Sequence, residues 1–140
     1  ITNVEGRNIP WSFEASAMAQ TIEEANSPSV GATAIYNYSN RFEFGLRALS
    51  TLSGAEYERG HSIQAIQRYR FYKSKTDLFV EFNQGYAVDN FDEYSLFGSS
   101  IGLSHSISNE ISFGGFAGAD KVIDKSGISP KISTFVSVSL

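Results

Sequence analysis

The sequence predicts an all-β fold in which eight antiparallel strands close into an up-and-down barrel. Along most of the chain, apolar and polar residues alternate with a period of two, which is the pattern of a strand with two unlike faces. Eight such segments follow one another, and Gly, Ser, Asn, Asp or Lys marks the joints between them. The length of 140 residues fits a single domain, 1–140, and a closed barrel leaves no strand edge unpaired.

The first four expected strands lie at 11–21, 29–38, 41–51 and 62–72. Ala, Met, Gln and Glu between 15 and 25 favour a helix locally, but they lie inside a longer alternating run. The apolar positions of these strands are, in chain order, Trp11, Phe13, Ala15, Ala17 and Ala19; Val30, Ala32, Ala34 and Tyr36; Phe42, Phe44, Leu46 and Ala48; Ile63, Ala65, Tyr69 and Phe71.

The last four expected strands lie at 77–88, 94–106, 110–120 and 131–140. The sixth has the weakest pattern, because Ser and Gly interrupt it, and we interpret Gly114, Gly115 and Gly118 in the seventh as positions that permit curvature or close packing. The apolar positions are Leu78, Val80, Phe82, Tyr86 and Val88; Phe97, Ile101 and Leu103; Ile111, Phe113, Ala117 and Ala119; Ile132, Val136, Val138 and Leu140.

The opposite face of the strands carries three acids and three bases, namely Glu14, Glu43, Arg47, Arg68, Arg70 and Glu81. A hairpin around 73–76 sets Phe71 opposite Leu78 and Arg68 opposite Glu81, which is the unlike-charge pairing of a specified register. Inside a narrow barrel these groups could pair and avoid the cost of isolated buried charges. We therefore expect an ion-pair network and no open aqueous pore, since apolar residues share that face: Ile35, Leu49, Ile66, Phe79, Phe116 and Phe135.

Alternation alone leaves open which face lies inside. A soluble lipocalin-like barrel would turn its apolar face inward and could bind a hydrophobic ligand, whereas a membrane barrel would turn it toward lipid. The joints favour the membrane, because the short ones share one end with both termini. The expected short joints are 38–40, 73–76 and 106–108, and the expected longer ones are 21–28, 51–61, 89–93 and 120–130.

Aromatic residues form two bands along the expected strands, as in the interfacial belts of membrane barrels. The band at the short-joint end contains Trp11, Tyr36, Phe42, Phe44, Tyr69, Phe71 and Tyr72. The band at the other end contains Tyr57, Tyr86, Phe91 and Tyr94.

In strand number, joint lengths and aromatic bands the chain resembles the small eight-stranded outer-membrane barrels, the group of the OmpA transmembrane domain, OmpX and NspA. The resemblance implies a monomeric transmembrane β-barrel in the outer membrane of a Gram-negative bacterium, with its termini in the periplasm and in contact with lipid and lipopolysaccharide. Members of this group end in an alternating strand, closed by an aromatic residue, that the barrel-assembly machinery reads. The corresponding residues here are Ile132, Thr134, Val136, Val138 and Leu140. Leu140 replaces the aromatic residue, and Phe135 lies on the interior side.

Composition excludes several classes of function. The absence of Cys excludes disulfides, thiolate catalysis and Cys-based metal sites, and the net charge of −4 argues against a nucleic-acid partner. No apolar run approaches the length of a membrane-spanning helix. We expect no cofactor and no metal centre. A solvated acidic rim is the expected role of Glu23, Glu24, Asp89, Asp92, Glu93, Asp120 and Asp124, which could share divalent cations with lipopolysaccharide phosphates.

Few residues offer catalytic chemistry. His105 is expected to be a turn or interfacial histidine, whereas His61, beside Ser62 and near Glu56 and Glu58, could act as a general base toward a lipid ester. The leading hypothesis is a non-enzymatic envelope or surface protein that acts through its outer loops. The alternatives are a soluble lipocalin-like carrier and an outer-leaflet lipid-modifying enzyme that uses His61.

Two glutamines do not fit the apolar face. Gln67 and Gln84 both lie on it, where they could bond across the hairpin, be turned inward by a bulge, or mark a protein contact.

Overall fold

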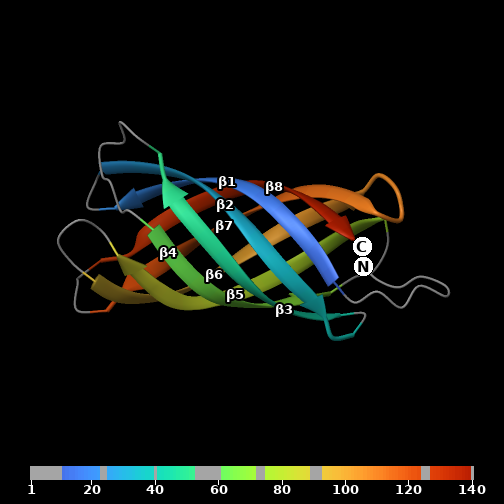
Figure 1. Ribbon diagram of the computed structural model, residues 1–140, viewed down its shortest axis with the longest axis horizontal. Helices are drawn as coiled ribbons and strands as arrows, with labels where there is room; N and C mark the ends of the chain where they lie inside the picture. Colours follow the sequence, from blue (N-terminus) through green and yellow to red (C-terminus); the bar gives the residue numbers. More distant parts are fainter. Residues whose placement is uncertain are drawn as a thin grey trace.

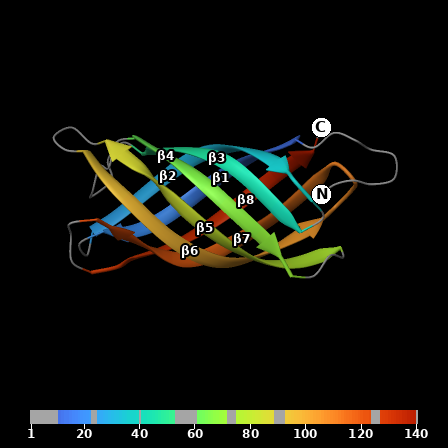
Figure 2. The same ribbon diagram turned by 90° about the horizontal axis from the view of Figure 1, so that it is seen from below.

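The computed structural model is a closed barrel of eight antiparallel strands, in which each strand pairs with its neighbours in sequence and the first pairs with the last. It describes residues 11–22, 25–39, 41–52, 61–71, 75–88, 93–123 and 127–139. The strands are β1 (Trp11–Ile22), β2 (Ala25–Asn37), β3 (Phe42–Thr51), β4 (His61–Arg70), β5 (Thr76–Val88), β6 (Glu93–Ser106), β7 (Ile111–Val122) and β8 (Ser129–Ser139). The predicted fold class is confirmed: the strands wind obliquely around one axis (Figure 1; Figure 2). β1 begins and β8 ends at the same end of the barrel, the terminal end.

The alternation turns the apolar face outward and the polar face inward. Leu46 and Ile63, for example, are each 62% exposed, whereas Arg68 and Glu81 are fully buried. This orientation rules out the lipocalin-like alternative, which needs the apolar face inside. Along β5 the outward positions from Thr76 to Tyr86 span about 25 Å of the barrel axis, at about 3.3 Å per residue and a tilt of about 40°. The described residues include no helix long and apolar enough to span a bilayer.

The joints differ from the expected pattern because β1, β2, β7 and β8 are longer than the sequence suggested. At the end away from the termini the joints have two, nine, four and six residues, whereas those at the terminal end have four, five and four. The expected long joints at 21–28 and 120–130 are therefore wrong, and the asymmetry in joint length is smaller than predicted.

Two prolines account for this error. The expected joints 21–28 and 120–130 end at Pro28 and Pro130, but both prolines lie inside strands. Pro28 comes directly before Ser29, the first residue of β2 that pairs with β3. Pro130 likewise comes directly before Lys131, the first residue of β8 that pairs with β1. Each proline is therefore at a local edge of the sheet, where the missing N–H interrupts no ladder on that side.

Glycines on the inward face make room for bulky neighbours. A Cβ atom on Gly102 would lie 2.5 Å from Cζ of Phe79 and 2.8 Å from Cβ of Phe116. A Cβ atom on Gly114 would clash with the carbonyl oxygen of Leu103. The weak pattern of β6 thus reflects packing, since a larger residue at Gly102 would occupy the space of two interior rings.

Candidate functional site

The centre of the barrel holds an arginine between two glutamates. The Arg68 guanidinium donates hydrogen bonds to Glu14 (Nη1 to Oε2, 2.6 Å) and to Glu81 (Nη2 to Oε1, 2.8 Å). Glu81 also accepts two bonds from Arg47, of 2.7 and 3.1 Å. All four side chains are buried. Charge-assisted bonds of this geometry are the strong ones, and here they offset the cost of removing the charges from water.

The network continues toward the end of the barrel that holds the termini. Arg70 donates from Nε to Glu43 (3.0 Å) and from Nη1 to the Ser104 hydroxyl (2.7 Å), with Asp77 at 3.4 Å from Nη1. Glu43 also lies 3.6 Å from Arg68 Nη1, which links this part to the centre. The six charged residues singled out in the sequence therefore lie in one connected network, and Asp77, which points inward from β5, is an additional member.

Aromatic rings fill the space around these cations. The guanidinium carbon of Arg68 lies 4.5 Å from the ring centre of Phe79 and 5.3 Å from that of Phe135, and that of Arg47 lies 5.0 Å from Phe116. Cation–π attraction supplements the ion pairs in such a desolvated site. The middle section of the barrel is thus occupied by charged groups and rings in contact.

A second polar cluster lies in the half of the barrel away from the termini. Lys131 donates from Nζ to Asp120 (2.7 Å) and to the Asn83 carbonyl (2.8 Å), and Asn83 donates to Gln64 (3.1 Å). Gln20 donates to the other Asp120 oxygen (2.9 Å). The prediction that Asp120 belongs to an exposed rim is wrong, because this residue is 2% exposed inside the barrel. Placing Pro130 in a loop hid the Asp120–Lys131 pair, although both residues have inward parity once β7 and β8 are extended.

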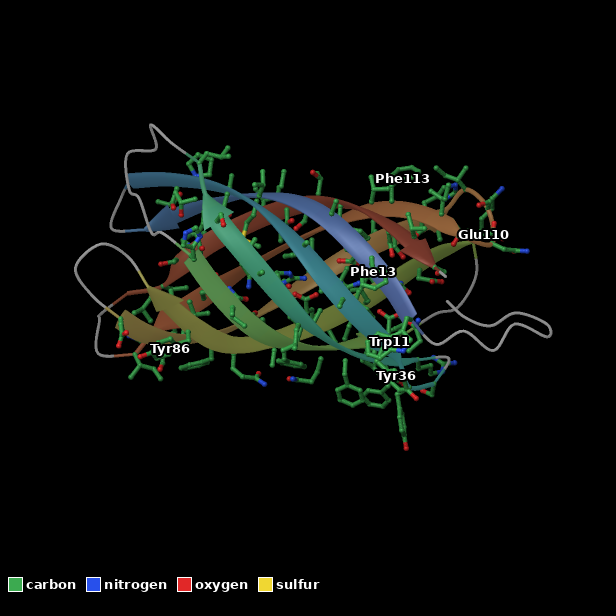
Figure 3. All side chains as sticks on the ribbon, in the orientation of Figure 1. Trp11, Phe13, Tyr36, Tyr86, Glu110 and Phe113 are labelled. Atoms are coloured by element: carbon green, nitrogen blue, oxygen red, sulfur yellow. The ribbon has the colours of Figure 1, made fainter. Side chains whose placement is uncertain are left out.

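The aromatic residues predicted at the terminal end lie on the outer surface of neighbouring strands. Ring centres are 5.1 Å apart for Trp11 and Tyr36 and 5.0 Å apart for Phe42 and Tyr69. Phe44 and Phe71 extend the series through ring contacts with Phe42 and Tyr69. In Figure 3, Trp11 and Tyr36 lie at the terminal end of the barrel and Tyr86 lies at the opposite end. The side chains of Tyr57, Tyr72, Phe91 and Tyr94 lie outside the described part of the structure.

Comparisons with known proteins identify the fold. No protein-family model matches the chain, and no curated protein matches its sequence. The crystal structure of Neisserial surface protein A (NspA) matches with a TM-score of 0.67 at 15% identity, covering 93% of this chain and 96% of that one. The N-terminal β-barrel domain of Pseudomonas aeruginosa OprF matches with a TM-score of 0.67 at 13% identity, covering 92% and 97%. This chain has the fold of a small outer-membrane β-barrel.

A designed protein has the same architecture. A de novo transmembrane β-barrel matches with a TM-score of 0.63 at 11% identity, covering 96% of this chain and 98% of the designed one. The resemblance expected from strand number, joint lengths and aromatic bands is therefore confirmed for the fold. Identities this low leave function to be argued from the residues themselves.

The two histidines of this barrel occupy equivalent places at opposite borders of the outward band. Nδ1 of His61 lies 2.8 Å from the Ser50 hydroxyl on β3, and Nδ1 of His105 lies 2.8 Å from the Thr76 hydroxyl on β5. Ser62, expected beside His61, points into the barrel. Because the same cross-strand pair occurs at both borders, its geometry does not distinguish His61 from His105.

The remaining candidate polar groups are only partly described. Glu93 accepts a hydrogen bond of 3.0 Å from the Tyr86 hydroxyl. The predicted loop acids Glu23, Glu24, Glu56, Glu58, Asp89, Asp92 and Asp124 lie outside the described residues. In the part of the chain that is described, no three acidic or histidine side chains gather in a way that could hold a metal ion.

The last strand presents its alternating residues to the outside. Ile132, Thr134, Val136 and Val138 are exposed, whereas Phe135 is buried against Phe79 and Phe116. Leu140, the final residue of the predicted assembly signal, lies outside the described residues. Phe135 therefore contributes to interior packing and is not available as an outward aromatic residue.

Gln67 and Gln84 remain on the outward face, and no bulge turns either one inward. Gln67 pairs with Phe82 in the β4–β5 ladder, and Gln84 pairs with Ala65. Neither amide has a hydrogen-bond partner among the described residues. If this surface faces lipid, an amide without a partner costs about 1–3 kcal/mol or more, and the two side chains then need a further explanation.

Proposed function

We propose that this protein is an integral outer-membrane barrel of a Gram-negative bacterium, which serves non-enzymatically as an envelope or surface protein through its outer loops. The observation that carries the proposal is the predominantly apolar outward band, bordered by aromatic and histidine residues, around an interior whose buried charges are ion-paired with one another. A band about 25 Å tall matches the hydrocarbon thickness that such barrels span. If the same barrel were soluble, its outward apolar band would be exposed to water, which is unfavourable.

The proposed partners follow from the same surfaces. The band contacts outer-membrane lipid and lipopolysaccharide, and the exposed residues of β8, Ile132, Thr134, Val136 and Val138, offer the alternating strand that the barrel-assembly machinery reads. The termini and the joints after β2, β4 and β6 face the periplasm, and the joints after β1, β3, β5 and β7 face the outside.

We expect no stable large single-channel conductance from the purified protein in planar lipid bilayers. The ion pairs of Arg47 and Arg68 with Glu81, together with the rings of Phe79 and Phe116, occupy the middle section of the barrel. A porin recorded under the same conditions is the positive control, and gel mobility before and after boiling shows that the inserted protein is folded. Long-lived openings of uniform, porin-like size would contradict a filled interior.

Single cysteines test the location and orientation of the barrel, since the native chain has no cysteine that could react in the background. Ile107 and Ile128 form a matched pair: both are exposed, at 63% and 69%, and they lie at opposite ends. In intact cells a polymer-linked maleimide too large for porins should label Ile128→Cys and leave Ile107→Cys unlabelled. Permeabilising the outer membrane should make both reactive. The reverse pattern in intact cells would overturn the orientation, and no labelling of either before permeabilisation would overturn the surface location.

A further inference from the structure

The two unpartnered amides lie at the middle of the lipid-facing surface. In the β4–β5 ladder the outward pairs between them and the terminal end are Tyr69–Val80 and Phe71–Leu78. Toward the opposite end the next outward pair is Ile63–Tyr86. Gln67 and Gln84 take diagonal positions in the two rows between these groups. They are therefore placed where the surroundings of an inserted barrel offer the fewest hydrogen-bonding groups.

Short polar side chains elsewhere on the band pose a smaller problem. Thr134 on β8 and Ser99 on β6 are also exposed, but a hydroxyl close to the main chain can return its hydrogen bond to a nearby carbonyl group. A glutamine amide stands further out and presents two N–H donors and one carbonyl acceptor. Gln67 and Gln84 therefore remain in need of an external partner that both donates and accepts.

In contrast to the monomer that the resemblance implies, we propose that the outer face of β4, β5 and β6 around Gln67 and Gln84 is the interface of a homodimer within the membrane. The proposal rests on the membrane insertion proposed above. Two copies inserted in the same orientation are related by a two-fold axis parallel to the membrane normal, which places residues of equal depth opposite one another. A second copy thus brings glutamine amides to the required depth, and an amide pair can exchange two N–H···O bonds. Polar side chains hold transmembrane segments together in this way.

The shape of this face is also suited to a copy of itself. Phe82 and Phe97 protrude beside the small residues Ala65 and Ser99 in the same two rows, Gln67–Phe82–Ser99 and Ala65–Gln84–Phe97. A two-fold axis through such a surface can seat the rings of one copy over the small residues of the other. Protruding and recessed positions on one patch are what an isologous contact requires.

Cysteine cross-linking in vesicles of phosphatidylcholine tests the proposal, and the cysteine-free chain again provides a clean background. Ala65→Cys lies on the proposed interface, and Ala17→Cys lies on β1, on the far side of the barrel. With a bifunctional maleimide, which bridges two cysteines that are near but not in direct contact, Ala65→Cys at high dilution in lipid should form covalent dimers well above the level of Ala17→Cys. Equal cross-linking of the two variants would overturn the proposal.

A second measurement removes the amides themselves. Gln67→Leu/Gln84→Leu should lower the dimerisation constant, measured by energy transfer between labelled copies at increasing lipid dilution, about tenfold or more. Thr134→Val, an outward polar-to-apolar change on β8, should leave it unchanged. Vesicle flotation and gel mobility before boiling report insertion separately, so a failure to insert would count against the proposed function. An inserted wild-type protein that stays monomeric, or a double variant that dimerises as well as wild type, would count against the interface.

Discussion

Arg68→Met should destabilise the barrel by about 3–5 kcal/mol, the cost of breaking a buried ion pair by removing one partner. Arg68 bonds Glu14 and Glu81 and lies 3.6 Å from Glu43, so the substitution leaves these carboxylates with one cation fewer. Glu81 keeps its hydrogen bonds from Arg47, whereas Glu14 loses its 2.6 Å bond from Arg68. The largest part of the loss should therefore come from a carboxylate left inside the barrel without its counter-charge.

Urea unfolding in lipid vesicles, followed by the mobility of unboiled samples on gels, measures this loss. Adding Glu14→Gln to Arg68→Met should recover part of the stability, because the double variant no longer buries the orphaned charge. Lys75→Met is the control, since Lys75 is exposed in the joint after β4 and should change stability by no more than about 0.5 kcal/mol. An Arg68→Met variant as stable as the control would show that the network contributes little.

Gly102→Leu should have an effect of similar size for a steric reason, with a loss of roughly 3 kcal/mol or no closed barrel at all. The first atom of the new side chain would lie 2.5 Å from both the Phe79 ring and the Gly115 carbonyl oxygen. A ring can rotate away, but the carbonyl belongs to the neighbouring strand of the barrel wall. Relief therefore requires the β6–β7 ladder to separate.

Two substitutions calibrate this prediction with the same unfolding assay. Gly102→Ala adds one carbon and should cost less than Gly102→Leu, about 1–3 kcal/mol. Ala117→Leu adds bulk on the outward face of β7, opposite Ile101, and should be close to neutral. If Gly102→Leu and Ala117→Leu unfold at the same urea concentration, the interior is not packed tightly at Gly102.

The strands and the sorting of their residues onto two faces could be predicted because both depend on local alternation. Which of the two faces lies inside was not contained in the alternation and had to be predicted from the joints and the aromatic bands. The Arg68–Glu81 register followed from one hairpin, since a turn around 73–76 fixes which residues face each other. Alternation also assigns parity, and parity alone placed the three arginines and three glutamates on a common face. Which of them bond to which depends on strand stagger around the closed barrel, and a linear pattern does not contain that information.

The errors have a common cause in proline. Pro28 and Pro130 interrupt the alternating pattern, and in isolation a proline argues for the end of a strand. A strand can contain these prolines only where the neighbouring strand has stopped pairing on that side, which is a property of the assembled sheet. The Asp120–Lys131 pair was missed for the same reason, and with it the cluster around Asn83.

The pairing of β1 with β8 has a consequence for the order of folding. Ser12 lies opposite Ser139, so the closing ladder joins residues from nearly opposite ends of the described chain. Until β8 docks, the seven preceding strands can form only an open sheet with two bare edges and a broad apolar surface. Contacts of such wide sequence separation form slowly, and exposed strand edges favour aggregation in the meantime. Closure should therefore be the late and rate-limiting step of folding. A chain arrested before β8 pairs should be the species that aggregates most readily with other copies of itself.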